Sequence, residues 1–293
     1  MAVGIAAAAI ATVIGAGAVA KDGGAASTKG KVAVAVKADG ADAPGMWMGV
    51  TEEEFKQLHE LKQDAPAALK GEMVQLGEAK GYLSLPPGAK GPLPAVIVIH
   101  EWWGLNDHIK HWADRLAADG YAALAVDLYR GELATTPDRA MELIKAVEDE
   151  PSLKALRAGI DFLESDPRVK ATHIGSIGWC FGGHWSLRTA LLDPDLDACV
   201  LYYGRPVTEV AQLAGIKAEV LGVFGTQDAS LPEETVGGFE AALKEAGVKA
   251  RILRYDAVHA FANPSNPKYD QVSAGKAWDE VRELFGRTLK PGK

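Results

Sequence analysis

Short apolar runs alternate with longer amphipathic stretches from about residue 71 to the end of the chain. The apolar runs have the length of β-strands, and the stretches between them repeat apolar residues at helical spacing. Strands are predicted over residues 73–76, 81–85, 95–99, 121–126, 173–177, 198–203, 219–224 and 250–255. Helices are predicted in an Asp107-capped segment, over residues 138–148 and 152–164, in a segment that ends at Leu192, and over residues 232–246 and 270–289. This alternation indicates an α/β fold whose mostly parallel sheet has helices on both faces and an antiparallel hairpin at one edge.

Residues 1–20 differ in kind from the rest of the chain. They are almost wholly Ala, Val, Ile and Gly and end in Ala18-Val19-Ala20, although no Lys or Arg precedes the apolar run. This pattern is typical of a secretory signal peptide with its cleavage site. A membrane anchor is the alternative, but the run is short and rich in alanine for a span. The sequence therefore predicts a protein exported to the periplasm or the extracellular space, or a cytoplasmic one if the segment is not a signal.

Three further parts follow this segment. Residues 21–50 are rich in Gly, Ala, Lys and Asp, which predicts a flexible linker. Thr51 and Glu54 have the spacing of a capping box, so a helical extension is expected over residues 51–70. Residues 71–293 then form one α/β domain.

Composition limits the classes of function. A chain of 293 residues with 48% apolar content can bury a full core. Its net charge of −8 argues against a nucleic-acid partner, which would require a basic surface. Two cysteines do not make a disulfide scaffold, and Cys199 lies in an apolar strand where burial should leave it inert. A small-molecule partner is expected, with a monomer or small homo-oligomer and no stable membrane span after signal cleavage.

The sequence Gly178-Trp179-Cys180-Phe181-Gly182 joins a predicted strand to a predicted helix. It has the form G-x-Nu-x-G of a nucleophile elbow, with cysteine as the nucleophile. The N–H of Phe181, directly after the nucleophile, would contribute to an oxyanion hole. The same glycines also occur around buried cysteines in ordinary strand–helix turns.

Two later residues complete a catalytic set. Asp228 follows one predicted strand and His259 follows the next, so that nucleophile, acid and histidine occur in the chain order of an α/β-hydrolase triad. All three residues come after strand ends, which is where open α/β sheets bind ligands. Each alone could be an ordinary loop residue. Together they predict that Asp228 orients His259 and that His259 takes the proton of Cys180.

The chain also resembles the dienelactone hydrolase family, from roughly Gly81 to Leu289. The matching pieces are PAVIVIHEWWGL at 94–105, GYAALAVDLY at 120–129, GWCFGG at 178–183, YYG at 202–204, GTQD at 225–228 and HAF at 259–261. The resemblance implies an α/β-hydrolase fold and a Cys180–His259–Asp228 triad that cleaves small esters or lactones without a cofactor.

The resemblance also implies roles for residues outside the triad. The N–H of Trp102 would be the second oxyanion donor, and Glu101 would pair with the resting thiol of Cys180. Trp103 and Tyr129 are candidate substrate-binding residues, although aromatic core packing explains them equally well.

Two positions bear on the charge of the substrate. By the same resemblance, Arg130 stands within one residue of the place of a substrate-binding arginine of the family. A second such arginine is replaced by Asn263 here, which puts dienelactone itself in doubt as a substrate.

Other classes of function fit less well. His100-Glu101 lacks the second histidine of H-E-x-x-H, and His108 and His111 lack a third ligand at matching spacing, so no metal site is predicted. No C-x-x-C pattern supports a redox protein. The remaining alternative is a binding protein that kept the α/β-hydrolase fold without its activity.

Overall fold

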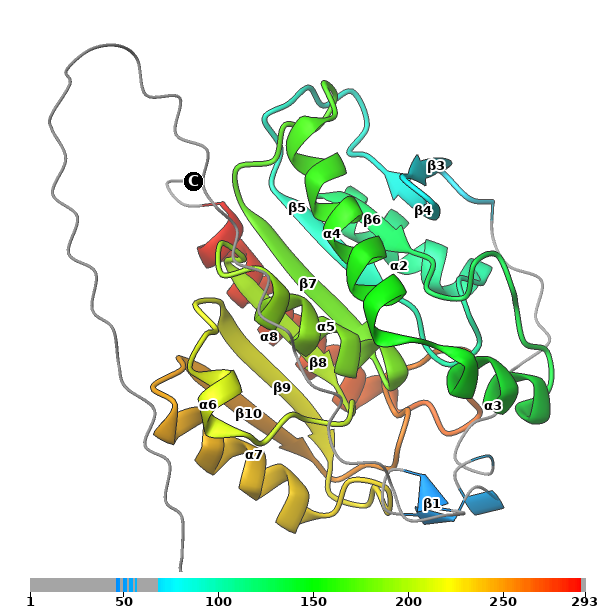
Figure 1. Cartoon of the computed structure of the whole chain (residues 1–293), viewed down its shortest axis with the longest axis vertical. Coiled ribbons are helices and arrows are strands. Elements are labelled where there is room, and N and C mark those ends of the chain that lie inside the picture. Colours follow the sequence, from blue (N-terminus) through cyan, green and yellow to red (C-terminus); the bar gives the residue numbers. More distant parts are fainter. Residues whose placement is uncertain (1–45, 48–49, 52, 55, 57–67, 291–293) are drawn as a thin grey trace, which may run out of the picture. The chain divides into compact units, whose positions relative to one another are not determined.

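The structure is a computed structural model that describes residues 46–47, 50–51, 53–54, 56 and 68–290 (Figure 1). The predicted signal peptide at 1–20 and nearly all of the predicted linker at 21–50 lie outside these residues. At the start of the predicted extension, the capping box is present. The Thr51 N–H and hydroxyl donate to Glu54 Oε2 over 2.8 and 2.7 Å, and the Glu54 N–H donates to the Thr51 hydroxyl over 3.2 Å. The rest of this extension lies largely outside the described residues.

The central sheet has eight strands in the order β10-β9-β8-β7-β5-β6-β4-β3. Its strands are β3 (Glu72–Leu76), β4 (Ala79–Ser84), β5 (Ala95–Ile99), β6 (Ala122–Val126), β7 (Ile174–Trp179), β8 (Ala198–Tyr202), β9 (Glu219–Gly225) and β10 (Ala250–Tyr255). All pairs from β10 to β6 are parallel, whereas β6–β4 and β4–β3 are antiparallel. The predicted parallel sheet with an edge hairpin is therefore confirmed. A separate two-stranded pair, β1 (Met46–Trp47) and β2 (Val50–Thr51), was not predicted.

Helices cover both faces of the sheet. They are α2 (Asp107–Ala118), α3 (Pro137–Ala146), α4 (Asp149–Ser165), α5 (Phe181–Leu192), α6 (Val210–Leu213), α7 (Glu233–Glu245) and α8 (Gln271–Leu289). Helices α4 and α5 pack together on one face, and α2 and α8 lie on the other (Figure 1). The short helix α6 was not predicted. Among the described helices, none is both long and apolar enough to cross a membrane.

The N-terminus of α2 differs from the prediction in a single detail. Asn106, not Asp107, is the N-cap, because its side-chain oxygen accepts the N–H of Ile109 over 3.2 Å. Asp107 is the first helical residue, where its charge favours the positive end of the helix dipole.

The apolar core is centred on the middle strands. Every residue of β5, β6, β7, β8 and β9 is buried, whereas β10 is only half-buried at the edge of the sheet. Helix α5 is buried along most of its length, so the turn that precedes it is held between the sheet and its helical cover. The carboxyl ends of the parallel strands are thus a rigid platform for loops.

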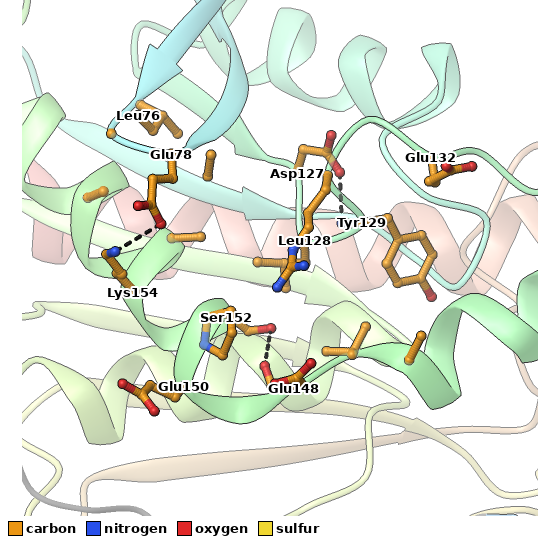
Figure 2. A pocket seen from close by; sticks show the side chains of 18 of the residues that line it. Leu76, Glu78, Asp127, Leu128, Tyr129, Glu132, Glu148, Glu150, Ser152 and Lys154 are labelled. Carbon is orange, nitrogen blue, oxygen red and sulfur yellow. Dashed lines mark hydrogen bonds and ion pairs between the residues drawn. The ribbon is translucent and has the colours of Figure 1, made fainter.

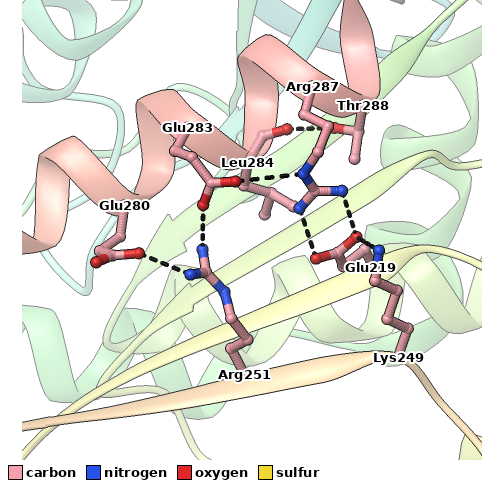
Figure 3. A network of polar contacts seen from close by, with 8 residues as sticks. All are labelled: Glu219, Lys249, Arg251, Glu280, Glu283, Leu284, Arg287 and Thr288. Carbon is pink, nitrogen blue, oxygen red and sulfur yellow. Dashed lines mark hydrogen bonds and ion pairs between the residues drawn. The ribbon is translucent and has the colours of Figure 1, made fainter.

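A network of ion pairs links α8 to strands β9 and β10 at one edge of the sheet (Figure 3). Arg287 donates to both carboxylate oxygens of Glu219 over 2.7 and 2.8 Å. Arg251 of β10 pairs with Glu280 and Glu283 over 2.8 and 2.7 Å. Because Arg287 binds Glu219 through two hydrogen bonds, the contact fixes the relative orientation of the two side chains in addition to pairing their charges.

Candidate active site

Cys180 occupies a sharp turn between β7 and α5, which end and begin at its two neighbours. Its φ of 53° and ψ of −117° lie in a region that non-glycine residues avoid, at a cost on the order of 1–3 kcal/mol. The flanking glycines permit the turn, because a Cβ at Gly178 would overlap the carbonyl of Gly182 and a Cβ at Gly182 would overlap that of Ile99. The turn has the strained geometry expected of a nucleophile elbow.

The side chain of Cys180 is only 1% exposed. Burial, and after it the charge of Glu101, raises the pKa of the thiol well above its ordinary value. A hydrogen bond from the N–H of Phe181 acts in the opposite direction. The resting thiol is therefore protonated, and it requires a base before it can act as a nucleophile.

A histidine–carboxylate pair lies in the same buried region. His259 Nδ1 is 2.5 Å from Asp228 Oδ2, and both side chains are almost fully buried. Ser230 donates to Asp228 Oδ1 from its hydroxyl over 2.6 Å and from its N–H over 2.9 Å. Burial opposes the charge of Asp228, but the attraction of His259 and these hydrogen bonds outweigh it, so the pKa of Asp228 is lowered. An ionised Asp228 favours the tautomer that donates from His259 Nδ1 and leaves Nε2 as the acceptor.

Segments that follow three of the parallel strands supply these residues. Cys180 follows β7, Asp228 follows β9 and His259 follows β10. The structure thus brings Asp228 and His259 into direct contact, and Asp228 lies near enough to Cys180 to act electrostatically on its thiol.

Glu101 lies two residues beyond the end of β5 and is 6% exposed. Burial raises its pKa to about 8, and a hydrogen bond from Asn263 opposes this rise. Asn263 Nδ2 donates to Glu101 Oε2 over 2.5 Å. The residue that replaces an arginine of the family is therefore in contact with Glu101, which the sequence alone did not predict.

The predicted aromatic residues lie around this cluster. Trp102 and Trp103 are buried, with their rings 5.0 Å apart and inclined by 61°. The Tyr129 ring lies 5.3 Å from that of Phe181, and its hydroxyl is buried without a hydrogen-bond partner in the described part of the chain. Burial, and after it the charge of Cys180, raises the pKa of Tyr129 well above 10. Tyr129 is thus a protonated donor near the candidate nucleophile.

Arg130 lies elsewhere. Its side chain is exposed and lines a pocket of about 870 Å³ between the β3–β4 turn, the loop after β6, and helices α3 and α4 (Figure 2). Lys154 and Glu78 form an ion pair of 2.9 Å in this pocket. Cys180 and its partners do not line it, whereas Tyr129 does. We place the candidate site at Cys180, Asp228 and His259, because no nucleophile–base pair lines the pocket.

Several positioning residues were missed in the sequence. Asp127 accepts the N–H groups of Tyr129 and Gly131 over 2.8 and 2.5 Å, which shapes the loop after β6. Ser230 holds Asp228, and its Asp-x-Ser spacing is the signal that could have revealed it, since Asx turns bond the backbone two residues on. His100 accepts the Leu128 N–H at Nε2 over 3.1 Å, a contact between distant segments that no local pattern reveals.

Within the described ranges, no group of three or more His, Cys, Asp or Glu residues is arranged to hold a metal ion. His184 instead makes a 3.0 Å contact from Nδ1 to the carbonyl oxygen of Arg205. His111 lies 3.8 Å from the carboxylate of Asp114.

Comparisons with known proteins agree with this fold. The model of the dienelactone hydrolase family matches residues 79–289. An Escherichia coli protein named "Putative carboxymethylenebutenolidase" is 33% identical over 70% of this chain and 80% of its own. "Protein usf" of Aquifex pyrophilus is 32% identical over 75% of this chain and 99% of its own.

The solved structures include a dienelactone hydrolase-like promiscuous phosphotriesterase from metagenomic libraries. It has a TM-score of 0.67 and 28% identity, and the match covers 76% of this chain and all of that one. The residues matched by the family model, 79–289, include the strained elbow and the histidine–carboxylate pair described above. The chain therefore belongs to the dienelactone hydrolase family.

Proposed function

We propose that this protein hydrolyses small ester or lactone bonds with Cys180 as nucleophile, His259 as base and Asp228 as the orienting acid. Family membership supports carboxylic ester hydrolysis as the reaction. The assignment of residues rests mainly on one observation, the 2.5 Å contact between His259 and Asp228 beside a strained cysteine turn.

The first chemical step is attack by sulfur. His259 Nε2 takes the proton of the Cys180 thiol, and the thiolate bonds to the carbonyl carbon of the ester. The carbonyl oxygen becomes an oxyanion, for which the N–H groups of Phe181 and Trp102 are the proposed donors. Collapse of this intermediate returns the proton from His259 to the leaving alkoxide and leaves a thioester on Cys180.

The second step releases the acid. A water molecule gives a proton to His259 and attacks the thioester carbon, and the returning proton regenerates the Cys180 thiol. Asp228 stabilises the imidazolium in both halves of the reaction, because it stays ionised next to His259. In a lactone, the leaving oxygen remains attached to the product by its ring carbons.

Glu101 affects how readily the Cys180 thiol ionises. With a pKa of about 8, it carries its proton at neutral pH and then does not repel the thiolate of Cys180. Trp103 and Tyr129 are proposed to contact the substrate, with the Tyr129 hydroxyl as a donor. Arg130 lines the pocket of Figure 2, which Cys180, Asp228 and His259 do not line, so no contact with a small substrate is proposed for it.

The test is hydrolysis of a panel of small esters and lactones by the wild type, Cys180→Ala and Cys199→Ala. Cys199 is a matched control, since it is fully buried in β8 and its thiol lies 3.6 Å from the Ser186 hydroxyl. Cys180→Ala should lose roughly 10⁴-fold or more in rate, whereas Cys199→Ala should stay active. Equal rates in Cys180→Ala and wild type would refute the nucleophile, and an inactive wild type that still binds these esters would favour a binding protein.

A further inference from the structure

Tyr203 has a strained backbone at the end of β8. Its φ is 35°, although it is not glycine, and its N–H donates to the carbonyl of Val223 over 2.8 Å. Gly204 packs so closely on the first turn of α5 that a Cβ there would overlap the backbone N of His184. Close packing on both sides thus imposes the conformation of Tyr203, at a cost that commonly marks functional sites.

This conformation places the Tyr203 side chain among the residues of the candidate site. The side chain is fully buried, and its ring lies 5.1 Å from that of His259 and 5.7 Å from that of Phe261. Its hydroxyl has no hydrogen-bond partner in the described part of the chain. A buried hydroxyl that remains unsatisfied destabilises the fold, so stability alone does not account for its presence.

The pKa of the Tyr203 hydroxyl is affected by several neighbouring acidic groups. Burial, and after it Glu101, Cys180, Tyr202 and Asp228, raises the pKa of Tyr203 well above 10. Tyr203 therefore keeps its proton at neutral pH, and its O–H can act as a donor. The groups that raise this pKa most after burial are groups that can carry a negative charge.

A thiolate at the candidate nucleophile would be stabilised by a donor of this kind. A thiolate at Cys180 would be almost fully buried, and the N–H of Phe181 is one backbone donor that acts on it. Burial of a charged group is unfavourable unless hydrogen bonds replace its water. A further donor at the sulfur would lower the free energy of the thiolate.

We propose that Tyr203 is a catalytic residue whose hydroxyl donates a hydrogen bond to the Cys180 sulfur as the thiol ionises. The inference rests on the proposed role of Cys180. The thiol proton goes to His259 Nε2, Tyr203 keeps its own proton, and the hydrogen bond weakens as the sulfur bonds to the acyl carbon. Tyr203 thus favours the ionised nucleophile without taking part in proton transfer.

The test is the rate at which iodoacetamide alkylates Cys180 as a function of pH, followed by mass spectrometry. The matched control is Tyr202→Phe, because Tyr202 is equally buried and adjacent in sequence, but Tyr255 and Arg115, not Cys180, act on its hydroxyl. Tyr203→Phe should be alkylated about tenfold more slowly near neutral pH, with its profile displaced upward by about one pH unit. Tyr202→Phe should follow the wild type.

Three outcomes would overturn the inference. The first is an alkylation profile of Tyr203→Phe that matches the wild type, even if KM for esters rises, since the hydroxyl would then serve the substrate. The second is the same displacement in Tyr129→Phe but not in Tyr203→Phe. The third is a Tyr203→Phe protein that fails to fold or melts clearly below the wild type, because the hydroxyl would then be structural.

Failure of the proposed function gives a different result. Alkylation reports on the sulfur without ester turnover. A Cys180→Ala protein that hydrolyses esters normally would refute the nucleophile, while a displaced alkylation profile in Tyr203→Phe would still support the hydrogen bond.

Discussion

Asn263 donates from Nδ2 to Glu101 Oε2 over 2.5 Å, and both side chains are buried. The orientation of the amide is fixed, because its oxygen accepts the N–H and the hydroxyl of Ser265 over 2.8 and 2.6 Å. Glu101 therefore meets a neutral donor where the family resemblance places a cation. A single hydrogen bond from the side-chain amide of Asn263 does not offset the cost of burying the Glu101 charge. The pKa of Glu101 is therefore raised to about 8.

The first prediction concerns the pH dependence of hydrolysis. Above about pH 8, Glu101 loses its proton and its charge disfavours the Cys180 thiolate. We expect kcat/KM of the wild type to fall above this pH, and the fall to be absent in Glu101→Gln. Complete inactivity of Glu101→Gln at every pH would instead show that a carboxylate base at this position is essential.

The second prediction concerns stability. Between pH 4.5 and about 8, folded Glu101 keeps a proton that the unfolded chain loses, so the free energy of unfolding falls as the pH rises through this range. Glu101→Gln removes this dependence. Urea unfolding should show Glu101→Gln gaining stability relative to the wild type, on the order of a few kcal/mol, between pH 5 and pH 9. A difference that is constant across this range would contradict the raised pKa.

Local patterns predicted the sheet and the candidate triad because both depend on short-range signals. The apolar runs specify buried strands, and residues after strand ends must meet at one edge of a parallel sheet. Cys180, Asp228 and His259 were found in this way. The predicted Asp107 cap was wrong by one residue. Asn106 and Asp107 are adjacent, and the side-chain oxygen of either residue type can accept an N–H of the first helical turn.

The partners of these residues were not predictable from spacing. Asn263 and Glu101 are far apart in the sequence, and their contact depends on how two loops fold over the strand ends. The positive φ of Tyr203 arises from the packing of Gly204 on α5, which is a tertiary effect. The resemblance placed Arg130 within one residue of a substrate-binding position. In the structure its side chain is exposed on the loop after β6 and lines a pocket that Cys180, Asp228 and His259 do not line.

The third prediction concerns the N-terminus. If residues 1–20 are a signal peptide, the mature chain begins near Lys21 and is exported. N-terminal sequencing of the protein from its native host should then start near Lys21. As a control, Ala18→Asp and Ala20→Asp should block cleavage, since the site requires small residues. An intact Met1 on protein from the soluble cytoplasmic fraction would contradict export.

The last prediction concerns the charge of the substrate. The described side-chain partner of Glu101 is the neutral amide of Asn263, at the position where the family resemblance calls for a substrate-binding arginine. An arginine–carboxylate hydrogen bond contributes about 1.5–3 kcal/mol. Without one, we expect kcat/KM for a lactone that carries a free carboxylate to be about ten- to a hundredfold below that for its methyl ester.

Two variants locate the cause of this preference. Asn263→Arg should raise kcat/KM for the free acid and leave that for the methyl ester nearly unchanged, because it supplies the missing charge next to Glu101. Arg130→Gln should leave the preference as it is, since Arg130 lines the separate pocket. A wild type that strongly prefers the free acid, and loses that preference in Arg130→Gln, would show instead that substrates extend past Tyr129 to reach Arg130.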